Sequence, residues 1–252
     1  MAGQGVDIDR MPRGGPKASC LDRLLQTDRL EYLDRDDVDP KLKRSVVTAL
    51  ERIGDWTGNH EKFAHVVLEE VAEVPDPRIL ELGSGHGGLS VKLLEMHPTA
   101  HVTVTDIEPD SVAAIAAGEL GNDDRATVRT MDATEIDAAD GSFDVAVFAL
   151  SFHHLPPAMA SRVIAEGTRV AATLVIIDLP RPPAPLHLLR LAAMLPFAPF
   201  VPFVHDGVIS SLRTYSPSAL RALAAHADPG IDVRLSGGMI GPQVAVAARR
   251  HG

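Results

Sequence analysis

Three carboxylates lie where successive strands of one predicted sheet end. Glu81 stands in a short apolar run, Asp106 ends the next such run, and Asp132 follows the third. The carboxyl ends of parallel strands meet at one edge of a sheet, so these acids should lie close together. Asp106 can accept hydrogen bonds from ribose hydroxyls, and Asp132 can accept one from an adenine amino group. Glu81 would repel a pyrophosphate and attract a cation. The three acids therefore predict a pocket for a positively charged nucleoside.

A glycine-rich turn follows the first of these strands. The sequence Gly83-Ser-Gly-His-Gly-Gly88 separates the strand from a predicted helix. Glycine lets the backbone approach a ligand closely, and free N–H groups at the helix start favour negative charge. The G-x-G-x-x-G spacing is also that of dinucleotide-binding folds, a motif that is weak on its own. Glu81 argues against a nicotinamide dinucleotide here.

Two histidines leave the carboxyl end of the fourth predicted strand, in Ser151-Phe-His-His-Leu155. Open α/β sheets bind their ligands at that edge. An imidazole has a pKa near neutrality, so His153 or His154 could take the proton of a hydroxyl acceptor. The structural alternative is that the pair only shapes the loop.

The elements that must position these groups alternate between strand and helix. Apolar runs that predict strands are separated by segments with helical spacing, which indicates a parallel, doubly wound sheet. A closing pair joined by a short glycine-rich connection predicts an antiparallel last strand and seven strands in all. The predicted strands are 78–82, 101–105, 126–130, 143–150, 173–177, 231–235 and 243–248. The fold class is therefore α/β, with a mostly parallel seven-stranded sheet.

Additions on either side of this alternation define the expected domains. Residues 1–19 show no hydrophobic period and predict a disordered tail. Residues 20–74 predict a helical N-terminal cap that carries Trp56, which we assign to the substrate side, folded over the cofactor; burial as a packing anchor is the alternative. Residues 75–252 predict a Rossmann-like domain, interrupted at about 180–212 by a proline-rich lid.

The lid and the fifth strand supply further candidates for the acceptor site. Asp178 ends that strand, and His205 and Asp206 close the lid. Such groups can act as a base, as hydrogen-bond acceptors for hydroxyls or as ligands of a hard cation such as Mg²⁺; no metal site is predicted, and an ordinary turn at Asp206 is the alternative. The apolar side chains of the lid fit core best, with an acceptor pocket, a homodimer face or a membrane surface as alternatives. They are Leu186, Leu188, Leu189, Leu191, Met194, Phe197, Phe200 and Phe203.

The amino-acid composition limits which classes of partner and cellular environment are expected. The 252 residues carry 24 Lys+Arg against 34 Asp+Glu, a net charge of −10, which disfavours nucleic acid, since binding its phosphates needs a positive surface. The single cysteine, Cys20, excludes an intramolecular disulfide and is typical of a reducing cytoplasm. We expect no signal peptide and no transmembrane segment.

The motifs together resemble class I S-adenosylmethionine-dependent methyltransferases, strongly over about residues 75–180. The resemblance rests on Glu-Leu-Gly-Ser-Gly-His-Gly, the Asp106 strand end, Met-Asp-Ala and the strand leading to Ser-Phe-His-His-Leu. It implies S-adenosylmethionine as cofactor, becoming S-adenosylhomocysteine. It also implies a cofactor site made by these residues: Glu81, Gly83, Ser84, Gly85, Gly87, Asp106, Ile107 on the adenine ring, Asp132, Ala133 and Ser151.

The expected function is methyl transfer to a small-molecule acceptor, most readily a hydroxyl oxygen of a phenolic or polyketide metabolite, a quinone precursor or a sugar. A nicotinamide-dependent oxidoreductase and a non-catalytic cofactor-binding protein are the alternatives.

Overall fold

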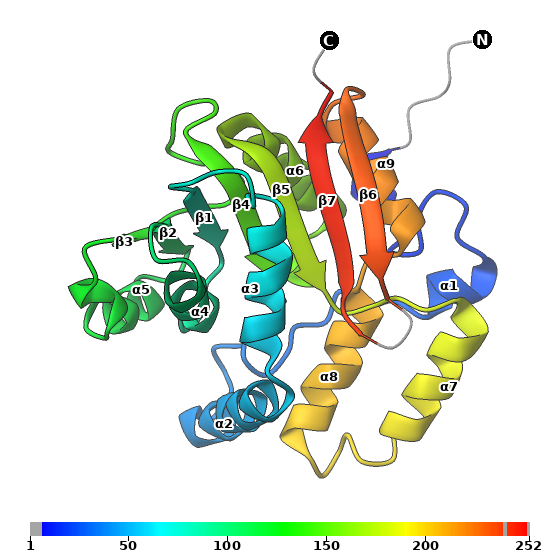
Figure 1. Cartoon of the computed structure of the whole chain (residues 1–252). Coiled ribbons are helices and arrows are strands. Elements are labelled where there is room, and N and C mark those ends of the chain that lie inside the picture. Colours follow the sequence, from blue (N-terminus) through cyan, green and yellow to red (C-terminus); the bar gives the residue numbers. More distant parts are fainter. Residues whose placement is uncertain (1–6, 239–240, 251–252) are drawn as a thin grey trace.

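The computed structural model describes residues 7–238 and 241–250 and contains one seven-stranded sheet in the order β3-β2-β1-β4-β5-β7-β6 (Figure 1). Only β7 runs against its neighbours, being antiparallel to both β5 and β6. The predicted fold class is confirmed. The strands are β1 (Arg78–Leu82), β2 (His101–Asp106), β3 (Ala126–Thr130), β4 (Phe143–Ala149), β5 (Ala171–Asp178), β6 (Ile231–Gly237) and β7 (Gln243–Arg249).

Helices cover both faces of the sheet, because the central strands are apolar on both sides. In β4, Val145 and Val147 point into the core shared with α3 (Asn59–Glu69), α4 (Gly88–Met96) and α5 (Pro109–Ala116). Ala146 and Phe148 point into the opposite core, with α6 (Pro157–Val170) and α9 (Pro217–Ala227). Ser216 caps α9 through its side chain and Pro217 is its first residue, and both residue types are common at helix N-termini.

The carboxyl ends of the parallel strands face α2 (Pro40–Thr57), α7 (Ala184–Met194) and α8 (Pro202–Arg213) (Figure 1). A separate, small hydrophobic core lies between the end of α1 (Cys20–Leu24), α7 and α8, and it contains Leu25, Leu191 and Val208. The remaining short elements are the 3₁₀ helices η1 (Ile8–Arg10), η2 (Leu120–Asn122) and η3 (Phe152–His154). Two helices therefore occupy the predicted lid.

The lid differs from expectation in its apolar side chains. Leu191 is buried, but Leu189, Phe197 and Phe200 are 67%, 59% and 83% exposed. Core is therefore the wrong assignment for most of them, because the α7–α8 hairpin packs along one narrow seam and leaves its outer side uncovered.

The N-terminal region also differs from expectation. Among the described residues, 7–19 are packed against the domain: Ile8 and Met11 join the core beneath α6, and Arg13 is 4% exposed. A disordered tail is therefore wrong for this stretch, while residues 1–6 lie outside the described residues. The helical cap is also divided, since α3 belongs to the layer on the sheet and α1 to the lid.

No helix in the described ranges is long and apolar enough to cross a membrane.

Candidate functional site

The glycine turn leaves β1 through three residues in the left-handed region. Gly83, Gly85 and Gly87 have φ angles of 61°, 58° and 76°, which glycine adopts without the steric cost of a Cβ. The amide of Ser84 donates to the carbonyl of Thr105 (2.9 Å), so the turn is tied to β2.

Asp106 holds the same turn from the end of β2. It is 8% exposed, and its Oδ2 accepts from the amide of Gly85 (2.8 Å) while Oδ1 accepts from the amide of Glu108 (3.0 Å). Each carboxylate oxygen keeps a second lone pair, so both can still accept from ribose hydroxyls. Ile107 is 57% exposed beside it, an apolar surface available to a flat ring.

Open space lies beside the turn. A Cβ on Gly85 would meet no atom within 4 Å, whereas one on Gly83 would lie 2.6 Å from the ring of Phe148. Moreover, the hydroxyl oxygen of Ser84 is buried and has no hydrogen-bond partner among the described residues. Free space next to exposed backbone and an unpartnered buried hydroxyl fit a polar ligand.

Glu81 is enclosed between β1 and α4. It is 3% exposed, and Ser90 donates a short hydrogen bond to its Oε2. Burial, with a smaller contribution from the charge of Asp106, raises the pKa of Glu81 to about 7 even though the Ser90 bond opposes the shift. Glu81 is therefore a buried acid beneath the turn, and its direct contact with a cofactor stays a prediction.

The other predicted cofactor residues lie at the ends of β3 and β4. Asp132 is exposed, and its Oδ1 accepts from the amide and hydroxyl of Thr134 (2.7 and 2.8 Å). Ala133 and Ser151 are half-buried. Their roles toward adenine and the methionine moiety stay predictions.

The chain turns sharply where β4 ends and the histidines begin. Leu150 has φ 55° and is the one non-glycine residue with positive φ in the described ranges; such conformations cluster at functional sites. Its amide donates to the carbonyl of Ile177 (2.7 Å). The turn places η3 over the carboxyl ends of β4 and β5.

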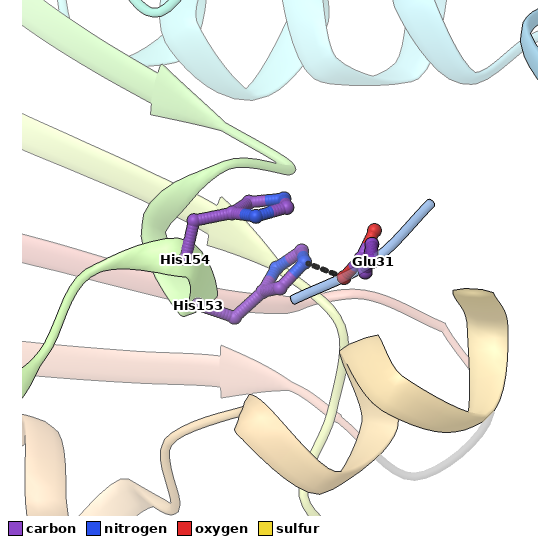
Figure 2. Close-up of side chains that lie close together, drawn as sticks. All are labelled: Glu31, His153 and His154. Carbon is purple, nitrogen blue, oxygen red and sulfur yellow. Dashed lines mark ion pairs between the residues drawn. The ribbon is translucent and has the colours of Figure 1, made fainter. Parts of the chain in front are cut away.

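His153 lies between two carboxylates. It is 3% exposed, and its Nδ1 is 2.7 Å from Oδ1 of Asp178. Its Nε2 is 3.5 Å from Oε1 of Glu31 (Figure 2). Burial alone would lower its pKa, but the charges and hydrogen bonds of Asp178 and Glu31 more than offset that and raise the pKa of His153 to about 9. The raised pKa favours the imidazolium form of His153 at neutral pH, and Asp178 orients the ring; a role of His153 as the base stays a prediction.

His154 is more open and is held by a different acid. Its ring lies over that of His153 (centroids 4.3 Å apart), and its Nδ1 is 3.0 Å from Oδ2 of Asp34. Burial raises the pKa of Asp34, but the bond from His154 and the charges of His154 and Arg213 outweigh it and lower that pKa below its usual value. An ionised Asp34 fixes hydrogen on Nδ1, which leaves Nε2 as the basic nitrogen of the neutral ring.

Two arginines fix the loop that carries both histidines. Arg213 donates to the carbonyl of His154 (2.6 Å) and to Asp34 (3.2 Å). Arg13 donates to the carbonyls of His153 (3.1 Å) and Leu155 (2.8 Å). The N-terminal stretch expected to be disordered therefore anchors the candidate site.

His205 and Asp206 lie inside α8, so a turn at Asp206 is wrong. Oδ1 of Asp206 accepts from the amide of Tyr32 (2.9 Å) and lies 2.9 Å from Nδ1 of His205, whose ring stacks on Tyr32 with centroids 3.9 Å apart. Ser210, one turn further along α8, donates to Glu31 (2.7 Å). The pair therefore holds the segment around Glu31 against the site, and a direct substrate contact stays a prediction.

Trp56 is 87% exposed on α2, so the alternative of a buried packing anchor is wrong. Its role on the substrate side stays a prediction.

Two of the acids that surround the histidines were not predicted from the sequence. Glu31 and Asp34 belong to a stretch expected to be a cap and linker, yet both reach residues more than 100 positions away. The only available signal was the density of acids in 31–39, and such a run is more often a solvated loop.

Comparison with known proteins agrees with this geometry. Residues 79–173 match the family described as methyltransferase domain. Over 102 residues the chain is 34% identical to a malonyl-[acyl-carrier protein] O-methyltransferase of Geobacter sulfurreducens, covering 40% of this chain and 37% of that protein. Over 53 residues it is 40% identical to a release factor glutamine methyltransferase of Deinococcus radiodurans, covering 21% and 19%. The matches thus span 37% and 19% of the length of these two relatives.

Among solved structures, a plantazolicin methyltransferase in complex with a pentazolic desmethylPZN analogue and S-adenosylhomocysteine has the same fold. It superposes with a TM-score of 0.64 at 11% identity, over 84% of this chain and 92% of that one.

The fold, the glycine turn and the family match identify the part of the chain around residues 79–173 as a class I S-adenosylmethionine-dependent methyltransferase domain. Its cofactor is S-adenosylmethionine. The residues present fit that group: the space beside Gly85, the unpartnered hydroxyl of Ser84, the carboxylate of Asp106 and the exposed face of Ile107 lie at one edge of the sheet.

The two glycines offer a matched pair of substitutions. Gly83→Ala and Gly85→Ala both cost about 1 kcal/mol because of positive φ. Gly83→Ala also drives a methyl into Phe148, so we expect a further loss of about 1–3 kcal/mol in unfolding free energy. Gly85→Ala should lose only the unfolding free energy that its positive φ costs, yet it should bind S-adenosylhomocysteine at least about tenfold more weakly. Calorimetry and thermal unfolding test both; wild-type affinity for Gly85→Ala would contradict the placement of the cofactor.

Asp106→Ala should weaken S-adenosylhomocysteine binding by on the order of 1.5–3 kcal/mol, the scale of hydrogen bonds to a charged group, which is about 10- to 150-fold in affinity. Asp110→Ala, on the exposed first turn of α5, is the matched control and should bind normally. Equal affinities for the two variants in calorimetry would remove the ribose assignment.

Proposed function

We propose that this protein transfers the methyl group of S-adenosylmethionine to a hydroxyl oxygen of a small molecule that lies against the His153–His154 pair. One observation carries the proposal: the pair sits where β4 leaves the sheet, and β4 is the direct neighbour of β1, whose end forms the glycine turn. Groups able to activate an oxygen thus stand next to the cofactor turn.

The chemistry required is modest. When bound, S-adenosylmethionine supplies a methyl group on a positively charged sulfur. An oxygen–carbon bond forms as the carbon–sulfur bond breaks with its electron pair going to sulfur, and the hydroxyl proton must leave. The protein's contribution is to align the acceptor, to exclude water and to activate the oxygen.

The residues divide this work between them. Asp178 and Asp34 orient the two imidazoles, while Arg13 and Arg213 hold the loop that carries them. Activation of the hydroxyl falls to the pair itself. An oxygen acceptor also fits the activity of one relative, an O-methyltransferase.

The experiment uses the full chain, S-adenosylmethionine with an isotopically labelled methyl group, and matched acceptors: phenols, sugars and hydroxyacids, each beside the same molecule with its hydroxyl removed. Label recovered as a methyl ether or ester only when the hydroxyl is present supports the proposal. Label on carbon or nitrogen would overturn oxygen as the acceptor atom. Tight S-adenosylhomocysteine binding without turnover of any acceptor would favour a non-catalytic cofactor-binding protein.

A further inference from the structure

We propose that Glu31, His153 and His154 form a binding site for a divalent first-row transition cation such as Zn²⁺ at the acceptor side. One ligand atom of each residue lies within 4.8 Å of those of the other two. Figure 2 shows the three side chains converging, with Glu31 coming from the N-terminal segment and the histidines from η3.

The ligand atoms have suitable types and spacing. Two imidazole nitrogens and one carboxylate oxygen form a donor set that binds zinc in catalytic sites, where a fourth position is left for a water or substrate. Ligand bonds of about 2.0–2.1 Å place two donor atoms of a tetrahedral zinc roughly 3.3 Å apart. Nε2 of His153 and Oε1 of Glu31 are already 3.5 Å apart, which is long for a hydrogen bond and close to that separation.

The hydrogen bonds behind the two rings strengthen the case. Histidines that bind metals through Nε2 commonly donate Nδ1–H to a carboxylate, which fixes the ring and raises its basicity. Both histidines have this support: Asp178 lies 2.7 Å from Nδ1 of His153, and Asp34 lies 3.0 Å from Nδ1 of His154. A simple ion pair between His153 and Glu31 would not explain why a second carboxylate, that of Asp34, also supports Nδ1 of His154.

The charge of the surroundings also favours a cation. Glu31, Asp34 and Asp178 surround the two imidazoles, and Glu31 is held in place by Ser210 (2.7 Å). Arg213 is the cation paired with Asp34.

The inference rests on the proposed function only for its use in catalysis, where the cation would bind the acceptor hydroxyl and lower the pKa of that oxygen. Metal binding itself is independent of it. The two ideas can therefore fail separately.

The experiment titrates chelator-treated, desalted full-length protein with Co²⁺ and follows visible absorption and calorimetric heat, then displaces the Co²⁺ with Zn²⁺. We expect one Co²⁺ per chain, and at least tenfold weaker binding in Glu31→Gln and His154→Gln. Asp34→Asn should weaken binding by a smaller factor, because it removes only the support of one ligand. His226→Gln, on the last turn of α9, is the control and should bind as the wild type does.

The site would be overturned if the wild type does not bind Co²⁺, or if Glu31→Gln binds Co²⁺ as tightly as the wild type does. S-adenosylhomocysteine affinity and thermal unfolding, measured on every variant, separate loss of the metal from loss of the fold. Hydroxyl methylation that persists in chelator with no Co²⁺ binding would reject the metal and keep the proposed function. Stoichiometric Co²⁺ binding without methylation of any hydroxyl would keep the metal site and reject the proposed function.

Discussion

His154→Ala should lower turnover by at least about 100-fold while leaving the affinity for S-adenosylhomocysteine within about twofold of the wild type. Activation of a hydroxyl by a positioned side chain is worth roughly 10²–10⁴ in rate. His154 is the more open of the two histidines, and Asp34 fixes its Nδ1, so its Nε2 is the nitrogen available to the acceptor side. The cofactor turn is tied to β2 through Asp106 and Thr105 and does not depend on this ring.

Steady-state kinetics with the acceptor found by labelling, together with calorimetry, check the expectation. His226→Ala controls for loss of a histidine elsewhere on the surface. Asp34→Asn should give an intermediate loss, since it leaves the imidazole but removes the group that orients it. Wild-type turnover in both His154→Ala and His153→Gln would remove the pair from the mechanism, whereas a parallel loss of cofactor affinity would point to damage in the fold.

Glu81→Gln should make the unfolding free energy of the cofactor-free protein less dependent on pH. The pKa of Glu81 is about 7 in the folded state, against 4.5 for an ordinary glutamate. Between those values the folded state holds a proton that the unfolded state has released, so stability falls as pH rises from about 4.5 and reaches its lower level above about 7. The destabilisation at alkaline pH is on the order of 3 kcal/mol.

Glutamine occupies the same volume and can still accept the hydrogen bond from Ser90, but it cannot ionise. The variant should therefore gain about 3 kcal/mol over the wild type between pH 4.5 and 8 in urea unfolding. Glu73→Gln, at an exposed position, should follow the wild-type curve. If Glu81→Gln also runs parallel to the wild type, Glu81 ionises like an exposed acid and its enclosure under α4 has no energetic effect.

The sheet could be predicted closely because its signals are local. β1 and β3 begin and end at the residues predicted from the sequence, 78–82 and 126–130. Strand ends then placed Asp106 beside the glycine turn and the histidine pair at the neighbouring strand. These residues lie on regular elements, whose geometry determines where a side chain at a strand end must be.

The acceptor side could not be predicted in the same way. The protonation state of His153 depends on Glu31, which is distant from it in the sequence. Glu31 lies in an irregular segment that Ser210 of α8 holds against the site. Arg13 makes single, specific hydrogen bonds to the loop, and such contacts create no hydrophobic period in the N-terminal stretch. Burial of a polar group by remote partners leaves no local pattern.

The contributions to the site divide by position along the chain. The glycine turn, Asp106 and the histidines lie within residues 79–173, the stretch that matches the methyltransferase family. The acids that orient or pair with those histidines, Glu31, Asp34 and Asp178, lie outside it. On the proposed function, exchange of residues 20–40 and 178–213 with those of a related chain would alter how the acceptor is held and leave the methyl-donor side unchanged, so acceptor preference could diverge as a separate module.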